Sequence, residues 1–238
     1  HVSSVSAGLY SNGRDDLAIF YFPEGSNHAV AYTQNSIVSE SITWNKENTK
    51  NNIKALVVNT KNANTFTGEQ GLRGLDEIAK NLVESLKKFE SENKYEKTKI
   101  KDILFASTGV IGEKFPVEKI KANIDNLVLN LKINQNKLIW IKMASAIMTT
   151  DTKPKVAYAE IKLGDKKIKI AGIAKGSGMI APNLATMFSF IFTDADISSV
   201  VLSKYLNKVL ANTFNAITID NDTSTNDMVA IFSTKKIK

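Results

Sequence analysis

Apolar residues recur at helical spacing most clearly over residues 71–90, GLRGLDEIAKNLVESLKKFE. The apolar positions lie three or four residues apart: Leu72, Leu75, Ile78, Leu82, Leu86 and Phe89. This spacing places them on one face of an amphipathic helix. Shorter helices are predicted from Pro116, which suits a first helical turn, over residues 137–148, and after a capping Ser198.

Runs of β-branched and aromatic residues between these helices predict strands. Two early strands, DLAIFYFPEG and AVAYTQNS, are expected with a turn at residues 23–25, Pro-Glu-Gly. Further strands are predicted in IKALVVNTKNAN, DILFASTGVIG and residues 187–192. A hairpin over residues 155–176 should turn at Gly164 and Asp165.

The C-terminal part reads as a short strand, AITID, and a polar turn, NDTSTND, that leads into a last helix. Four polar residues of that turn are expected to cap this helix: Asp222, Ser224, Thr225 and Asn226. Bracing a functional site is the alternative for them. Helices layered on mixed sheets predict an α/β (α+β) sandwich.

The composition excludes several classes of protein. The 238 residues are 43% hydrophobic and 23% charged, as in ordinary globular proteins. The absence of cysteine excludes disulfides, thiolate metal sites and cysteine nucleophiles. No apolar run reaches the roughly 20 residues of a membrane span, and the first residues do not resemble a signal peptide. We therefore expect a cytoplasmic protein without a membrane partner.

The net charge of +7 comes almost entirely from lysine, because Arg14 and Arg73 are the only arginines. The lysines are spread along the chain, often beside Asn or Glu. Proteins that read nucleic acids usually concentrate arginine and aromatic residues on one surface. We expect solvated lysine-rich faces and no nucleic-acid partner.

Few catalytic chemistries remain. His1 and His28 are the only histidines, so a Ser-His-Asp triad would depend on His28, and no G-x-S-x-G motif is present. A zinc site lacks ligands. GIAKGSG departs from a phosphate-binding loop, because three residues separate Gly172 from Gly176 and the lysine precedes the second glycine.

A hydroxyl nucleophile that needs no histidine is still possible at Thr186, which stands between a glycine-rich loop and an apolar run. A threonine that begins a chain can use its own α-amine as the base. Cleavage of the Ala185–Thr186 bond would create that terminus, and the small Ala185 leaves its carbonyl accessible. The alternative, a β-branched residue that simply starts a strand, is favoured by spacing alone.

Five blocks, each several residues long, carry a specific resemblance to a known family. They are NANTFTGEQGL, ASTGVIGEKFP, AIMTTDTKPK, AKGSGMIAPNLATM and DNDTSTND. In this order they resemble ornithine acetyltransferase, the bifunctional glutamate N-acetyltransferase family of arginine biosynthesis.

The resemblance implies a self-cleaving α/β sandwich with an N-terminal threonine nucleophile. Residues 1–185 would form an α chain and residues 186–238 the start of a β chain, which stay together in a cytoplasmic α2β2 assembly. Thr186 would take an acetyl group from N-acetylornithine and pass it to glutamate by a ping-pong mechanism. No metal or organic cofactor is implied, although some family members also use acetyl-CoA as donor.

The resemblance also assigns roles to other residues. Thr108 and Gly109 match the oxyanion hole, in which a hydroxyl and a backbone N–H stabilise the negative oxygen. Thr152 and Lys175 match positions that bind the amino-acid substrate. Each assignment has an alternative without a catalytic role. Thr108 and Gly109 could simply form a turn, Thr152 could be a polar turn residue, and Lys175 could be a solvated loop lysine.

Chains of this family continue beyond DNDTSTND. This chain is therefore expected to be truncated, without an acidic residue and a C-terminal polar segment that complete the substrate pocket. Two alternatives are an amide hydrolase or aminopeptidase on the same self-cleaving scaffold, with water as acyl acceptor, and an inactive truncated form that only binds an amino acid.

Overall fold

The computed structural model describes residues 1–49, 52–132, 136–180 and 187–237. Its strands are β1 (Val2–Val5), β2 (Leu17–Tyr32), β3 (Ile53–Asn59), β4 (Ile103–Ser107), β5 (Lys155–Leu163), β6 (Lys166–Lys175), β7 (Phe188–Ala195) and β8 (Met228–Ile237). They pair in the order β4-β3-β2-β8-β7-β6-β5, and β1 pairs with β2. The pairs β3·β4 and β7·β8 are parallel and the other pairs are antiparallel.

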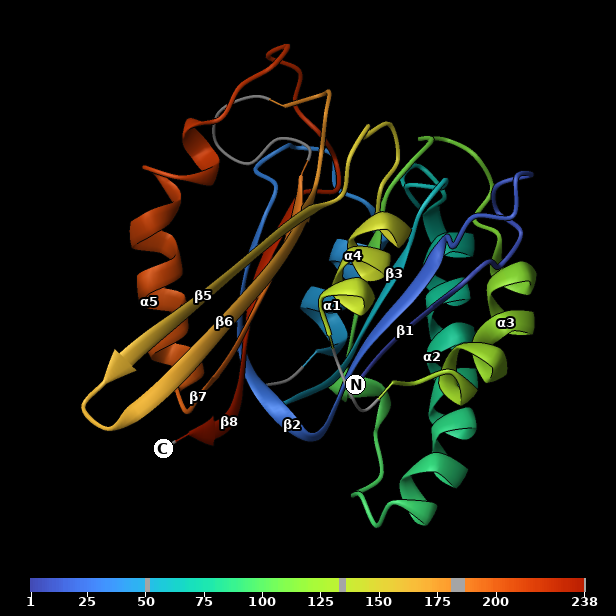
Figure 1. The fold of residues 1–238 in the computed structure, drawn as a ribbon. Coiled ribbons are helices and arrows are strands. Elements are labelled where there is room, and N and C mark those ends of the chain that lie inside the picture. Colours follow the sequence, from blue (N-terminus) through green and yellow to red (C-terminus); the bar gives the residue numbers. More distant parts are fainter. Residues whose placement is uncertain (50–51, 133–135, 181–186, 238) are drawn as a thin grey trace.

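Strand β2 is long enough to belong to both halves of the sheet (Figure 1). Its first part pairs with β3, its last part pairs with β8, and the pairing is irregular between Tyr21 and Ser26. The two halves face each other, because Phe20 of the first half lies 5.0 Å, ring to ring, from Phe192 of β7. Aromatic side chains thus fill the space between two stacked sheet layers.

Five α-helices in the described residues cover these layers. They are α1 (Glu40–Asn48), α2 (Gly68–Glu92), α3 (Val117–Leu129), α4 (Lys137–Ala146) and α5 (Ser199–Leu210). Helices α2 and α3 pack on the outer face of the first half, and α5 packs on β2 and β8 on the outer face of the second. Helix α4 contributes to the core between the halves. The order helix, sheet, sheet, helix is that of a sandwich.

Helix α2 shows why the sequence folds in this way. Leu75, Ile78 and Leu82 are buried against the sheet, as their helical spacing predicts. A Cβ on Gly74 would lie 2.4 Å from a methyl group of Val117, so glycine lets α2 approach α3 closely. The carboxylate of Glu40 on α1 accepts hydrogen bonds from the N–H groups of Thr67 and Gly68 at the N-terminus of α2, a favourable place for a negative charge.

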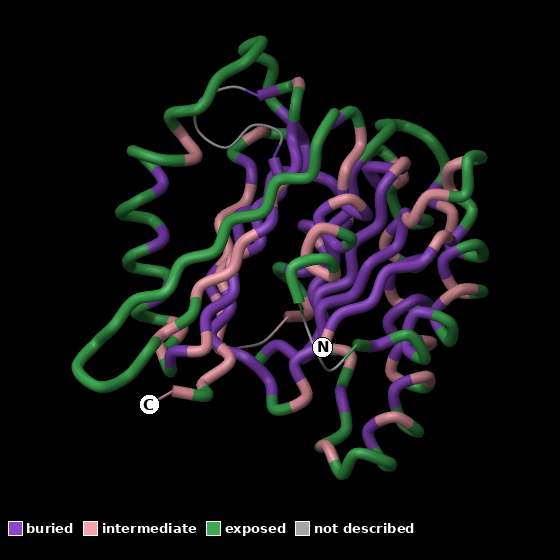
Figure 2. The backbone as a smooth tube through the Cα atoms, in the orientation of Figure 1, coloured by how far each residue is buried: buried purple, intermediate pink, exposed green. Residues whose placement is uncertain are grey.

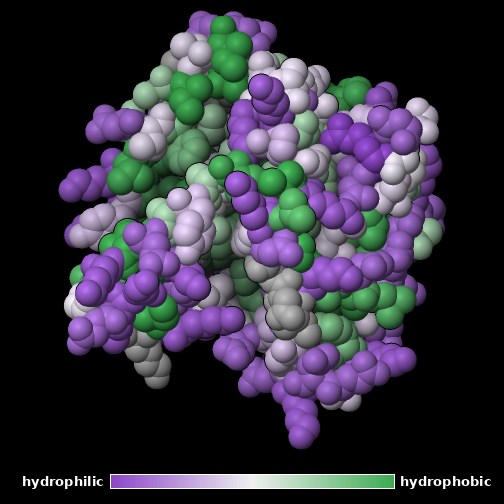
Figure 3. All heavy atoms as spheres, in the orientation of Figure 1, coloured by the Kyte–Doolittle hydropathy of each residue, from purple (hydrophilic) through white to green (hydrophobic). Residues whose placement is uncertain are grey.

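The hairpin of β5 and β6 extends from the sheet with little cover (Figure 2). Every residue of β5 is exposed, and only the C-terminal end of β6 enters the core. Hydrophilic side chains gather over this hairpin and also over the opposite half of the molecule (Figure 3). The part of the hairpin that matters for the site is therefore its anchored end at Lys175.

Most of the predicted elements are confirmed, and three are wrong. The two early strands form the single strand β2, because the expected turn becomes an irregularity at which Gly25 has a φ of 72°. The predicted last helix is the strand β8, paired on both sides by β2 and β7. Residues 216–220 do not form a strand; Ala216 ends the 3-10 helix η2 (Phe214–Ala216), and residues 217–220 belong to no helix or strand. Strand β1 and helix α1 were not predicted.

Within the described ranges, no helix combines the length and the apolar composition that crossing a bilayer requires.

Two leucines of α3 give a matched test of this packing. Leu127 is fully buried whereas Leu129 is 82% exposed, so only Leu127→Ala should leave a cavity. We expect Leu127→Ala to lower the free energy of unfolding by about 2–5 kcal/mol. Leu129→Ala should change it by less than about 0.5 kcal/mol in urea titrations. Equal losses for both variants would contradict the placement of α3.

Candidate active site

The turn of residues 107–109 follows β4 and is fixed by buried polar contacts. The Ser107 hydroxyl donates to Asn59 Oδ1 at 2.7 Å, and the Thr108 N–H donates to the Asn59 carbonyl at 3.1 Å. Because β3 and β4 are parallel neighbours, their carboxyl ends meet here, at the edge where such sheets bind ligands.

Gly109 has a backbone conformation that no other residue would adopt without strain. Its φ is 137°, and a Cβ would lie 2.1 Å from the backbone of Lys61. Among the described residues, no carbonyl accepts a hydrogen bond from the Gly109 N–H. The turn therefore offers a backbone donor beside the hydroxyl of Thr108.

Lys175 reaches this turn from the end of β6. Its Nζ donates to Thr108 Oγ1 at 2.9 Å and lies 5.7 Å from the ring centroid of Phe188. Lys175 is only 4% exposed, and Thr108 is buried as well. The contact joins residues 67 positions apart and places a cation beside the predicted oxyanion donors.

Burial lowers the pKa of Lys175 to about 8, because removing water from an ammonium ion disfavours its charged form. The carboxylates of Asp151 and Asp227 act in the opposite direction, and Lys155 adds to the lowering. The lysine therefore titrates near physiological pH.

Asp151 anchors the loop that follows Lys175. Its Oδ1 accepts hydrogen bonds from the Gly176 N–H at 2.7 Å and from Lys155 Nζ at 2.5 Å. Burial raises the pKa of Asp151, but the hydrogen bonds from Lys155 and Gly176 outweigh it and hold the pKa below its ordinary value. The carboxylate thus stays ionised and fixes the backbone next to Lys175.

Asn226 and Asp227 connect the turn to the strand that follows residue 186. The Asn226 side-chain amide donates to the carbonyls of Ala63 and Ser107, both at 2.6 Å. Asp227 Oδ1 accepts from the Met187 N–H at 2.7 Å. The predicted capping role is wrong for Asp222, Ser224, Thr225 and Asn226, because strand β8 and not a helix follows them. Asn226 braces the turn instead.

The structure brings together Thr108, Gly109 and Lys175 but leaves Thr152 apart. Thr152 is exposed and has no hydrogen bond to any described residue, although its neighbour Asp151 contacts the loop after Lys175. Ala185 and Thr186 lie outside the described residues. Asp151 and Asp227 were missed as site residues, although both stand in the sequence blocks that carry the resemblance.

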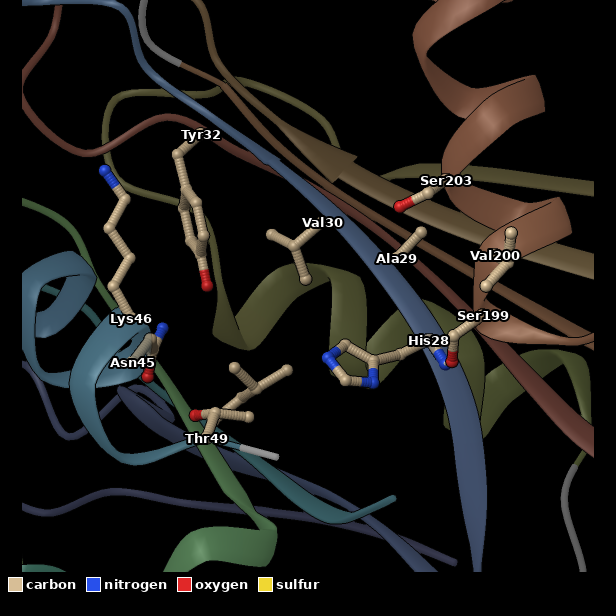
Figure 4. Close-up of a pocket in the computed structure, with 11 residues that line it drawn as sticks. His28, Ala29, Val30, Tyr32, Asn45, Lys46, Thr49, Ser199, Val200 and Ser203 are labelled. Carbon is tan, nitrogen blue, oxygen red and sulfur yellow. The ribbon is translucent and has the colours of Figure 1, made fainter. Parts of the chain in front are cut away.

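A separate pocket of about 520 Å³ lies between β2, α1 and α5 (Figure 4), and its described lining residues include none of the predicted site residues. His28 and Tyr32 line it, and the Asn45 amide is bound to the backbone of Phe105 at 2.8 and 2.9 Å. Lys46 is the only Lys, Arg, Asp or Glu among its described lining residues.

Comparison with known proteins identifies relatives over the whole chain. A model of the ArgJ family matches residues 1–238. The arginine biosynthesis bifunctional protein ArgJ of Gluconobacter oxydans is 40% identical over 98% of this chain and 52% of its own length. That of Bartonella quintana is 39% identical over 100% of this chain and 54% of its own length. The chain thus spans about half the length of these curated relatives.

Solved structures of related proteins have a similar fold. The arginine biosynthesis bifunctional protein of Bacillus halodurans has a TM-score of 0.62 at 26% identity, covering 76% of this chain and 88% of its own. Ornithine acetyltransferase complexed with ornithine, from Mycobacterium tuberculosis, has a TM-score of 0.61 at 25% identity, covering 78% and 91%. An aminopeptidase of Ochrobactrum anthropi, described as a variant of the Ntn hydrolase fold, has a TM-score of 0.53 at 11% identity, covering 98% of this chain and 71% of its own, and shows the fold alone. The predicted fold class is confirmed.

Lys175→Met should change how stability depends on pH. The folded-state pKa of about 8 lies below the ordinary 10.5, so between these values the unfolded chain binds more protons and the wild type gains stability as pH rises. The methionine variant lacks this gain. Its stability relative to wild type should fall by on the order of 3 kcal/mol between pH 8 and pH 10.5 in urea titrations.

Lys167→Met is the matched control for that experiment, since Lys167 stands on the same strand with its side chain 68% exposed. Its stability relative to wild type should not vary with pH in this way. A constant difference for Lys175→Met over the same range would show that Lys175 is not buried as described.

Asn226→Ala should destabilise the fold. The change removes the donor from two carbonyls, those of Ala63 and Ser107, at a buried position. We expect a loss of roughly 2–5 kcal/mol in the free energy of unfolding. Asn207→Ala on the exposed face of α5 should cost less than about 0.5 kcal/mol, and a similar cost for both would argue against the bracing role.

Proposed function

Because the chain belongs to the ArgJ family, we propose that it carries the acyl-transfer site of an ornithine acetyltransferase. This site would move an acetyl group from N-acetylornithine to glutamate in arginine biosynthesis. A solved relative named as an ornithine acetyltransferase complexed with ornithine supports the substrate class. In this chain, the observation that carries the proposal is the buried contact between Lys175 and Thr108 beside the Gly109 N–H.

The nucleophile in this proposal is Thr186 after cleavage of the Ala185–Thr186 bond. The Thr186 hydroxyl attacks the Ala185 carbonyl, the acyl group shifts from nitrogen to oxygen, and water hydrolyses the ester. The freed α-amine, with an ordinary pKa of about 7.7–8.0, can then accept the hydroxyl proton. The sequence match supports these roles, as does the anchoring of the next residue, Met187, by Asp227.

Acetyl transfer then takes two steps. Thr186 Oγ1 attacks the acetyl carbonyl, the carbon–nitrogen bond breaks, and the ornithine amine leaves with a proton from the α-ammonium group. The amine of glutamate attacks the acetyl ester and releases the Thr186 hydroxyl and N-acetylglutamate. Each attack creates an oxyanion that the Thr108 hydroxyl and the Gly109 N–H can stabilise. One such donor typically contributes about 2.7–4 kcal/mol to the transition state.

Lys175 and Thr152 are the proposed contacts to the amino-acid substrate. An ammonium ion suits a substrate carboxylate, and the anchoring of Gly176 by Asp151 keeps the lysine in place. Acetyl-CoA as an additional donor, and the absence of a metal or organic cofactor, stay predictions.

The proposed α chain (residues 1–185) and β chain (residues 186–238) would share one sheet. Strands β7 and β8 follow the cleavage position, yet they pair with β6 and β2, which precede it. Backbone hydrogen bonds would hold the two chains together after the cut. Assembly into an α2β2 complex and a place in the cytoplasm belong to the same proposal.

Thr186→Ala should abolish both cleavage and acetylation. The variant lacks the hydroxyl, so intact-mass spectrometry should show one uncut chain, while wild type gives two fragments that meet at residues 185 and 186. Thr186→Ser keeps a hydroxyl and should still cleave. Cleavage of Thr186→Ala as efficient as that of wild type would refute the proposal.

Incubation with N-acetylornithine, with and without glutamate, separates transfer from hydrolysis. Transfer predicts N-acetylglutamate and faster ornithine release when glutamate is present. Ornithine release at the same rate without glutamate, and no N-acetylglutamate, would identify an amide hydrolase. An intact chain that never acquires an acetyl group would indicate an inactive binding form.

A further inference from the structure

The hydrogen bond between Lys175 and Thr108 restricts the direction of the Thr108 hydroxyl proton. A lysine ammonium has three donors and no acceptor, so in this pair the threonine oxygen must accept. The hydroxyl has one proton, and that proton must then be given to another group. The proton is thus available for an oxyanion next to the Gly109 N–H.

We propose that Lys175 is a positioning residue for Thr108, whose ammonium form turns the Thr108 hydroxyl proton away from itself and into the oxyanion hole. This inference rests on the proposed acyl transfer and adds a role to carboxylate binding. A neutral lysine amine can accept a hydrogen bond, so after deprotonation the Thr108 hydroxyl can point back to Nζ. The oxyanion then loses one of its two donors.

The charged groups around Lys175 decide over which pH range this happens. Asp151, in the loop before β5, and Asp227, before β8, favour the ammonium form, whereas Lys155 on β5 opposes it. Burial outweighs the two carboxylates and brings the pKa to about 8. From β7, the side chain that faces Nζ is the uncharged ring of Phe188. The ammonium form therefore predominates at neutral pH and is lost under mildly alkaline conditions.

A neutral acetyl donor separates this role from substrate binding. p-Nitrophenyl acetate has no carboxylate for Lys175 to bind, so an effect of the lysine on acetylation by this ester must act in another way. The burst of p-nitrophenol from cleaved protein reports the acetylation rate. Thr108→Val should slow it about 10²–10³-fold, as expected for a lost oxyanion donor.

The double-mutant cycle gives the decisive comparison. Lys175→Met alone should slow acetylation by at least about tenfold, but by less than about twofold in the Thr108→Val background. Thr108→Ser keeps a hydroxyl and should restore the response to Lys175. Lys167→Met, on the exposed part of the same strand, should leave the rate unchanged. An equal effect of Lys175→Met with and without the Thr108 hydroxyl would overturn the inference.

A second measurement needs no acyl transfer. In protein labelled with ¹³C-lysine, the NMR titration midpoint of Lys175 should fall by at least about half a pH unit in Thr108→Val, because the charged form loses an acceptor, and should return in Thr108→Ser. An unchanged midpoint in Thr108→Val would overturn the inference. Wild-type protein that neither ester nor N-acetylornithine acetylates would refute the proposed function, while the titration still decides the role of Lys175.

Discussion

The buried side-chain amide of Asn226 is the interaction on which the arrangement of the site depends. Its two hydrogen bonds reach the loop before α2, at Ala63, and the end of β4, at Ser107. The adjacent Asp227 accepts a hydrogen bond from the N–H of Met187, the residue before β7. Buried carbonyls without a donor are costly, so the three segments keep one relative position. These hydrogen bonds thus determine where Thr108 and Gly109, the proposed oxyanion donors, lie relative to Met187.

Electrostatic interactions then determine the protonation state of Lys175, which contacts Thr108 in this arrangement. Burial of Lys175 disfavours its charge, and Asp151 and Asp227 recover only part of that cost. Without these two carboxylates the pKa of Lys175 would be lower still. The balance places the pKa of the lysine near that of a free α-amine, the base proposed for the nucleophile. The proposed acyl transfer would need the charged form of Lys175 and the neutral form of this α-amine, so it would depend on pH in this range.

Local patterns predicted those parts of the fold that local interactions determine. Helix α2 was predictable because its apolar face repeats over many turns, and the β5–β6 hairpin because its turn residues are distinctive. Strand β8 was not, because a short apolar run such as residues 228–232 fits a helix or a buried strand equally well. Family resemblance identified Thr108 and Lys175, but their contact spans 67 residues, and no local pattern predicts it.

The proposed cut precedes a strand, β7, that is paired on both sides in the sheet. A break next to an edge strand would leave the new terminus attached to the protein by one row of hydrogen bonds. Strand β7 instead lies between β6 and β8, and its aromatic side chains pack between the two sheet layers. Pairing and burial would hold this strand in place once the preceding peptide bond is gone. Residue 186 would stay covalently joined to Met187 after the cut, and Met187 is itself held by Asp227 and followed directly by the paired strand, so the fragment that carries the free amine would not depend on the broken bond for its place.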